Sequence, residues 1–135
     1  MRFVIDTNIF IAALLKDGAI RHIFVDSVHE FLFPEIIFEE IENHKEELLQ
    51  KSGIDILSFE DLLAKLIIYV KIISTEEIIL FKEKAQEIIN SIDPDDAAFF
   101  ATALAFDCPV WSDDRKLKEQ KEVKVYNTKE ILELI

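Results

Sequence analysis

Acidic residues stand at four separated points of the sequence, in places where an α/β protein often carries its chemistry. Asp6 directly follows a short apolar run, and Asp114 follows another run after two polar residues. Glu40 and Asp96 lie in segments with helical patterns. Carboxylate oxygens without a His or Cys cluster select hard cations such as Mg²⁺ or Mn²⁺. One or two such ions can activate water and stabilise the leaving oxygen when a phosphodiester is cut.

The first two carboxylates also have a structural interpretation. Asp6-Thr7-Asn8 precedes a helical pattern, and each of these residue types is a good helix cap. Glu40, at about 100° per residue, falls at the edge of the apolar face formed by Ile37 and Ile41. A carboxylate there needs a partner, because burying a bare charge is costly. A salt bridge or a side chain directed to solvent would satisfy it. His44 shares the apolar face and is expected to be a core residue, not a ligand.

The other acidic segments are ambiguous in the same way. In Asp93-Pro94-Asp95-Asp96, an N-cap and a proline at the first helical position explain the start of a helix. The two further acids would complement the helix dipole. Ser112-Asp113-Asp114 follows a strand pattern, and a turn or cap is the alternative. No single segment is specific, but two strand ends, a helix start and a buried helix edge together favour a metal site.

Apolar periodicity and capping residues predict strands that alternate with helices. We expect strands at 2–5, 30–33, 109–111 and 123–126, and a short strand or extended link at 71–74. We expect helices at 7–16, 19–28, 35–51, 58–70, 75–92, 94–106 and 114–120, and a last one ending at Leu134. The expected caps are Ser58 (paired with Asp61), Thr75, Asp93 and Asn127. Such alternation implies a parallel sheet covered on both faces, whose ligands bind beyond the carboxyl ends of the strands.

Composition narrows the classes of function. The 135 residues are half hydrophobic, which fits one globular domain over 1–135. Cys108 is alone, so an intramolecular disulfide and a Cys₄ zinc site are excluded and a reducing, cytoplasmic location is expected. We find no secretory signal and no apolar stretch of about 18 residues. With only two glycines, Walker and dinucleotide motifs are also excluded.

The net charge of −12 argues against a nucleic-acid partner, because phosphate contacts need Lys and Arg. The distribution of charge weakens this objection. Five of the fifteen basic residues lie within ten positions: Arg115, Lys116, Lys118, Lys121 and Lys124. A metal site built of carboxylates also counts as negative until its ions bind. Nucleic acid therefore remains a candidate partner.

Four segments resemble the signature of PIN domains, in the order of that family. They are Val4-Ile5-Asp6-Thr7-Asn8, Phe38-Glu39-Glu40-Ile41, the segment from Asp96 to Ala103, and Trp111-Ser112-Asp113-Asp114. Each segment alone is a weak signal, but the quartet is specific and spans most of the chain.

The resemblance implies a Mg²⁺- or Mn²⁺-dependent endoribonuclease on a three-layer α/β/α sandwich with a mainly parallel sheet of about five strands. Many small PIN proteins are VapC-like toxins of toxin–antitoxin pairs and form homodimers. An RNA substrate, a small antitoxin, a homodimer and no membrane are therefore expected. The carried-over catalytic metal ligands are Asp6, Glu40, Asp96 and Asp114. Residues expected to orient ligands or water are Asn8, Ser112 and Asp93. Residues expected to hold RNA phosphates are Arg115, Lys116, Lys118 and Lys121.

Two other interpretations stay open. A Mg²⁺-dependent phosphatase or receiver-like domain would use a strand-end Asp as phosphate acceptor, but no lysine is clearly placed at a strand end. A non-catalytic PIN-fold protein would only bind a partner, although all four ligand positions are occupied here. The segment 52–74 is longer than in the most compact members and could be a dimer surface, a lid or an antitoxin-binding patch. The sequence also leaves open one or two metals, and RNA or DNA.

Overall fold

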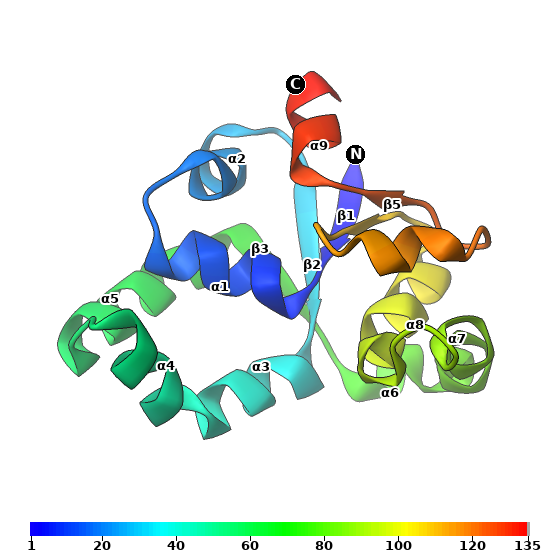
Figure 1. Ribbon diagram of the computed structural model, residues 1–135, viewed down its shortest axis with the longest axis horizontal. Coiled ribbons are helices and arrows are strands. Elements are labelled where there is room, and N and C mark those ends of the chain that lie inside the picture. The colour runs from blue at the N-terminus through cyan, green and yellow to red at the C-terminus, as the bar shows by residue number, and fades with distance from the viewer. Residues whose placement is uncertain (135) are drawn as a thin grey trace.

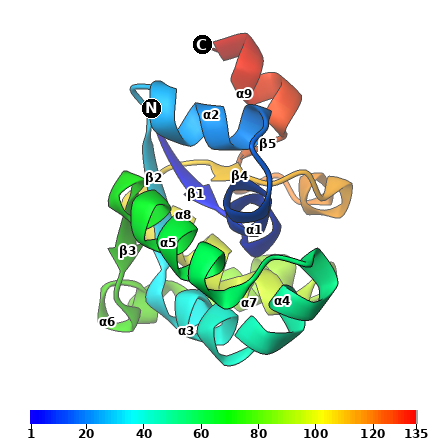
Figure 2. The same cartoon turned by 90° about the vertical axis from the view of Figure 1, so that its left-hand side faces the viewer.

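Five short strands form one parallel sheet in the order β3-β2-β1-β4-β5 in the computed structural model, which describes residues 1–134. The strands are β1 (Arg2–Ile5), β2 (Glu30–Pro34), β3 (Val70–Ile73), β4 (Val110–Trp111) and β5 (Val125–Tyr126). Helices flank this sheet (Figures 1 and 2), so the predicted α/β/α sandwich with a parallel, five-stranded sheet is confirmed.

The α-helices connect and cover the strands. They are α1 (Thr7–Leu15), α2 (Ala19–Asp26), α3 (Glu35–Asn43), α4 (Lys45–Ser52), α5 (Ile56–Leu66), α6 (Thr75–Ile78), α7 (Lys82–Ile89), α8 (Ala97–Phe106) and α9 (Thr128–Leu134). The 3₁₀ segments are η1 (Ile67–Tyr69), η2 (Ile79–Phe81), η3 (Pro94–Asp96) and η4 (Arg115–Glu119). Helices α1, α2 and α5 lie on one side of β1 and β2, and α6, α7 and α8 lie on the other (Figure 1). No helix of residues 1–134 is long and apolar enough to cross a membrane.

The central strands are apolar because the sheet is buried on both faces. Phe3, Val4 and Ile5 of β1 have no exposed surface, as expected for an inner strand of a covered parallel sheet. Helix α8 contacts β1, β2 and β4 and is itself buried along Phe99 to Ala103, which confirms the buried helix predicted there. The sheet and α8 thus form the rigid support for the residues that follow β1 and β4 and precede α8.

Two predicted helices are interrupted. The expected helix 35–51 is divided into α3 and α4 at His44, whose ψ of 16° leaves the helical range. His44 is exposed, so its predicted place in the core is wrong. The expected helix 75–92 is divided by the 3₁₀ turn η2. Apolar spacing did not reveal the break at η2, because a short 3₁₀ turn keeps residues three apart on the same face.

Two predicted caps are displaced. Asp55, not Ser58, caps α5, since its Oδ1 accepts a hydrogen bond from the Ser58 amide at 2.8 Å. Ser74, not Thr75, caps α6 in a reciprocal pair with Glu77. In each case a neighbouring residue of the same capping class holds the position. Asp93 is the cap of η3, as predicted.

Candidate metal centre

The site lies at the carboxyl end of β1 and β4. These strands are neighbours and parallel, with Ile5 paired to Trp111. The Asp6 amide continues the ladder by donating to the Trp111 carbonyl at 3.3 Å. The residues that follow each strand, Asp6 on one and Ser112 to Asp114 on the other, are therefore placed at one edge of the sheet, where ligands of parallel sheets bind.

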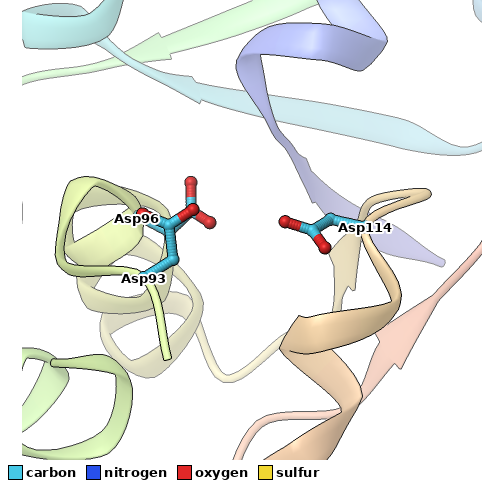
Figure 3. A group of neighbouring side chains, drawn as sticks. All are labelled: Asp93, Asp96 and Asp114. Carbon is cyan, nitrogen blue, oxygen red and sulfur yellow. The ribbon is translucent and has the colours of Figure 1, made fainter. Parts of the chain in front are cut away.

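Three carboxylates meet beside this edge, and we call them the carboxylate group: Asp93, Asp96 and Asp114. One oxygen from each lies within 4.8 Å of the others. Asp93 and Asp96 come from the turn that leads into α8, and Asp114 comes from the turn after β4 (Figure 3). The group contains only oxygen ligands, and all three side chains are half-buried. This donor set fits Mg²⁺ or Mn²⁺ and does not fit a structural zinc site.

Asp6 caps a helix, as predicted, and also lies near the carboxylate group. It caps α1, because its Oδ1 accepts a hydrogen bond from the Ile9 amide at 2.9 Å. Its side chain is only 6% exposed. Burial raises the pKa of Asp6, a hydrogen bond with Ser112 opposes the rise, and the charges of Asp113 and Asp114 add to it. Asp6 therefore belongs to the electrostatic surroundings of the carboxylate group as well as to the helix cap.

No member of the carboxylate group forms an ion pair with a basic residue within residues 1–134, and Asp96 shows the electrostatic consequence. Burial is the largest cause that raises the pKa of Asp96 to about 7, and the negative charges of Asp93, Asp6 and Asp114 raise it further. Like charges held this close disfavour each other's ionised form. A divalent cation would reverse that balance, because it is itself the largest charge in such a site. The residues present thus fit a divalent metal on their own chemistry.

Ser112 lies where the sequence predicted an orienting residue. It is 1% exposed, and its Oγ accepts a hydrogen bond from the Asp114 amide at 3.1 Å. The same hydroxyl interacts with Asp6. One buried hydroxyl therefore connects the Asp6 carboxylate, which follows β1, with the backbone of Asp114, which follows β4. The sequence predicted only an auxiliary role for Asp93, but Asp93 lies within the carboxylate group itself.

Glu40 and Asn8 lie outside the carboxylate group. Glu40 is exposed on α3, so its expected position at a buried edge is wrong. It lines a cleft between α1, α3 and α4 together with Thr7, the residue after Asp6. Asn8 is exposed at the start of α1. The structure thus places Asp96 and Asp114 within the carboxylate group, and the charge of Asp6 acts on Asp96 from outside the group. Glu40 lines the cleft next to Thr7.

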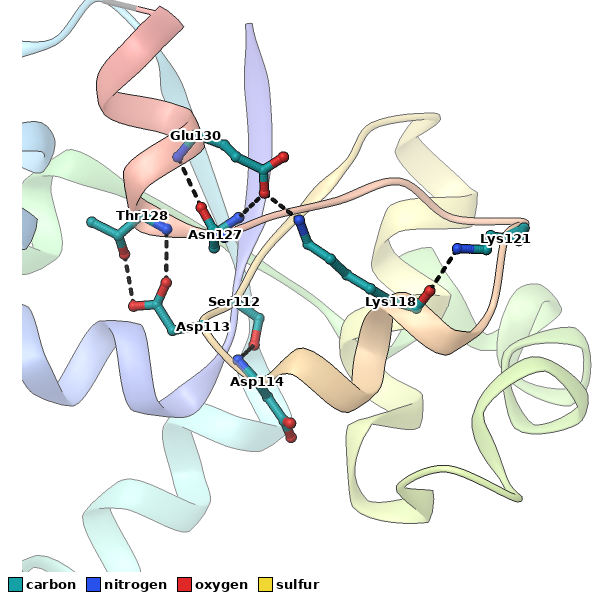
Figure 4. Close-up of polar contacts among 8 residues, drawn as sticks. All are labelled: Ser112, Asp113, Asp114, Lys118, Lys121, Asn127, Thr128 and Glu130. Atoms are coloured by element: carbon teal, nitrogen blue, oxygen red, sulfur yellow. Dashed lines mark hydrogen bonds and ion pairs between the residues drawn. The ribbon is translucent and has the colours of Figure 1, made fainter.

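The basic residues after Asp114 differ in their surroundings. Arg115 and Lys116 are exposed. Lys118 forms an ion pair with Glu130 of α9, and the Lys121 ammonium donates to the Lys118 carbonyl at 3.0 Å (Figure 4). Lys118 and Lys121 thus already have partners, whereas Arg115 and Lys116, which directly follow Asp114, are exposed.

Asp113 has a structural task that separates it from its neighbour Asp114. Its two oxygens accept hydrogen bonds from the amide and the hydroxyl of Thr128, both at 2.7 Å (Figure 4). We expect Asp113→Ala to destabilise the protein by about 0.5–1.5 kcal/mol in urea unfolding, because it removes two hydrogen bonds whose donors water can still reach. Mn²⁺ affinity in calorimetry should stay within about threefold, since Asp113 acts on the site only through its charge.

The matched variant is Asp114→Ala, which removes a member of the carboxylate group. Here Mn²⁺ affinity should fall by about a hundredfold or more, in line with the loss of a direct ligand. If Asp113→Ala weakened Mn²⁺ binding as strongly as Asp114→Ala, the assignment of these two neighbouring residues would be wrong.

Comparison with known proteins gives one match. The sequence model of a family described as PIN domain matches residues 4–133. A search among curated proteins found no significant match. The matched range contains all of the carboxylates described above.

Proposed function

Because the chain belongs to the PIN-domain family, whose members are typically metal-dependent nucleases, we propose that it is an endoribonuclease that hydrolyses RNA phosphodiester bonds. The observation that carries this proposal is the carboxylate group, in which three acidic side chains converge and, in the described part of the chain, form no ion pair with a basic residue. Asp6 adds a fourth carboxylate at the end of the neighbouring strand.

In this proposal Asp6, Asp96 and Asp114 hold Mg²⁺ or Mn²⁺, and Asp93 assists them. A divalent ion bound there would activate water and stabilise the departing oxygen. The protein's own contribution is to position the carboxylates: Ser112 orients Asp114 and interacts with Asp6.

We retain Glu40 as a proposed ligand, since it shares a cleft with Thr7 beside Asp6, and Asn8 as a residue that orients water or ligands. Glu40 differs from the strand-end carboxylates, because its side chain starts from an exposed helix position. A small approach of α3 when metal binds would bring this carboxylate nearer.

Contact with the RNA strand is proposed for Arg115 and Lys116, which directly follow Asp114 and are exposed. Lys118 and Lys121 could contribute only by leaving their present partners. Binding through such phosphate contacts weakens as salt rises, because each counterion released into a more concentrated salt solution gains less entropy.

The biological setting that we propose is the toxin of a VapBC-type toxin–antitoxin pair that acts in the cytoplasm as a homodimer. Its support is the size of the domain and the exposed apolar residues in the segment 52–74, namely Ile56, Leu57, Ile68 and Tyr69. Exposed apolar patches commonly mark protein–protein contact sites. A dimer in sedimentation and a short open reading frame beside the gene would support this setting, and a strict monomer without such a neighbour would count against it.

Cleavage of a mixed single-stranded RNA tests the proposed function, with DNA of the same sequence beside it. We expect cutting of RNA in Mn²⁺ or Mg²⁺, no cutting in EDTA, and no cutting by Asp6→Asn. Asparagine is a suitable replacement because it still caps α1, whereas alanine would cost about 1 kcal/mol of helix stability. Cutting that persists in EDTA would refute the metal-dependent mechanism. Folded protein that neither cuts RNA nor binds Mn²⁺ would favour the partner-binding interpretation.

A further inference from the structure

A second pocket opens next to the carboxylate group, between the turn after β4, η4 and the start of α9. Its lining includes Ser112 and Asp114, so it borders the carboxylate group directly. The remaining wall consists of Asp113, of Arg115 and Lys118 from η4, and of Asn127 and Lys129 from the C-terminal part of the chain. Residues distant in sequence thus converge beside the proposed metal.

Two carboxylates around this pocket, those of Asp113 and Glu130, already have partners, whereas Asp114 belongs to the carboxylate group. Both oxygens of Asp113 accept hydrogen bonds from Thr128 (Figure 4). The carboxylate of Glu130 accepts the Asn127 amide at 3.0 Å and pairs with Lys118. Local donors therefore partly offset the negative charge of Asp113 and Glu130. The pocket repels an anion less than the number of acidic residues around it suggests.

Arg115 and Lys129 differ from Lys118, the third cation that lines the pocket, which pairs with Glu130. Arg115 and Lys129 are exposed, and neither forms an ion pair with an acidic residue within residues 1–134. The Asn127 Oδ1 accepts a hydrogen bond from the Glu130 amide at 2.8 Å, which leaves its NH₂ as a donor. A guanidinium, an ammonium and a side-chain amide together match the oxygens of a phosphate.

We propose that this pocket binds a phosphate of the RNA strand next to the one held at the carboxylate group, with Arg115 and Lys129 as its main ligands. The inference rests on the proposed function and deepens it. It adds Lys129 to the RNA-binding residues and directs the strand over α9, instead of along the lysines that follow Lys116. A strand whose one phosphate sits at the carboxylate group must place a neighbouring phosphate nearby, and this pocket shares Asp114 with that group.

The test compares RNA affinity across salt concentrations for Arg115→Gln/Lys129→Gln, made in the Asp96→Asn background so that the strand stays whole. The parent for each titration is Asp96→Asn alone, and the matched control combines Lys82→Gln with Lys16→Gln, so that the pair and the control each lose two exposed cations. We expect the pair to raise Kd for a mixed single-stranded RNA about tenfold. The slope of log K against log salt should become shallower by about 0.7 for each lost phosphate contact.

Several outcomes would overturn the inference. One is a pair variant that binds like the Lys82→Gln/Lys16→Gln control; another is a slope that changes with Lys118→Gln/Lys121→Gln and not with the Arg115/Lys129 pair. Either result, in a protein that cuts RNA when Asp96 is present, refutes the pocket alone and leaves the nuclease standing. A wild-type protein that neither binds nor cuts RNA would refute the proposed function, and this inference with it.

Discussion

Asp96→Asn is expected to lower metal-dependent RNA cleavage by about a thousandfold or more, which corresponds to about 4 kcal/mol of transition-state stabilisation. Asp96 belongs to the carboxylate group, and burial together with the charges of Asp93, Asp6 and Asp114 raises its pKa to about 7. The amide keeps the shape of the side chain but carries no charge, so it cannot hold a divalent cation in the same way. Single-turnover cleavage at saturating RNA measures the effect on the chemical step.

The matched control is Asp95→Asn, one position earlier. Asp95 is exposed and lies outside the carboxylate group, so its variant should cut RNA at a rate within about twofold of the parent. The two variants share the same change in net charge and the same segment. Equal losses in both would mean that general charge, not a ligand, controls the rate, and an active Asp96→Asn would remove Asp96 from the site.

The metal-free protein is expected to lose stability as the pH rises from about 4 to about 7, and Asp96→Asn to remove much of this loss. The pKa of Asp96 is about 7 in the folded protein against 3.8 for the ordinary carboxyl. Between these values the folded state keeps a proton that the unfolded chain has released, so rising pH favours unfolding. The stabilisation is thus fully present below about pH 4 and lost by about pH 7. Because Asp96 is only half-buried, solvent screening reduces the effect to about 1–2 kcal/mol.

Urea unfolding in EDTA at low and high pH measures this effect. Asp96→Asn should be more stable than the parent above pH 7 and close to it near pH 4, while Asp95→Asn should follow the parent. A gain of the same size at both pH values would contradict the assigned pKa. Mn²⁺ at a hundred times its Kd should stabilise the parent by about 2.7 kcal/mol, and this gain should be absent from Asp96→Asn.

The sequence predicted the sheet and the strand-end part of the site well, for a physical reason. Parallel strands covered on both faces are continuous apolar runs, and a polar residue that ends such a run lies at the ligand-binding edge of the sheet. Asp6 and Asp114 could therefore be placed from the sequence. Asp96 could be placed because the proline and acidic residues before α8 mark the start of a buried helix.

The positions of the Glu40 and Lys129 side chains could not be predicted from the sequence. The position of the Glu40 side chain depends on the orientation of α3. That helix ends before His44 instead of continuing, and apolar spacing did not predict this end. Lys129 reaches the site from the last helix, and only the packing of α9 against the turn after β4 brings it beside Arg115. Contacts between distant segments have no local signal in a single sequence.

The most direct test of the metal centre is a crystal structure of the protein with Mn²⁺, in which anomalous scattering locates the ion. Our prediction is an anomalous peak for a Mn²⁺ ion bound by carboxylate oxygens of Asp96 and Asp114, with Asp6 beside it, and no such peak in crystals of Asp96→Asn. Peaks only elsewhere on the surface, or an undiminished peak in the Asp96→Asn crystals, would contradict it.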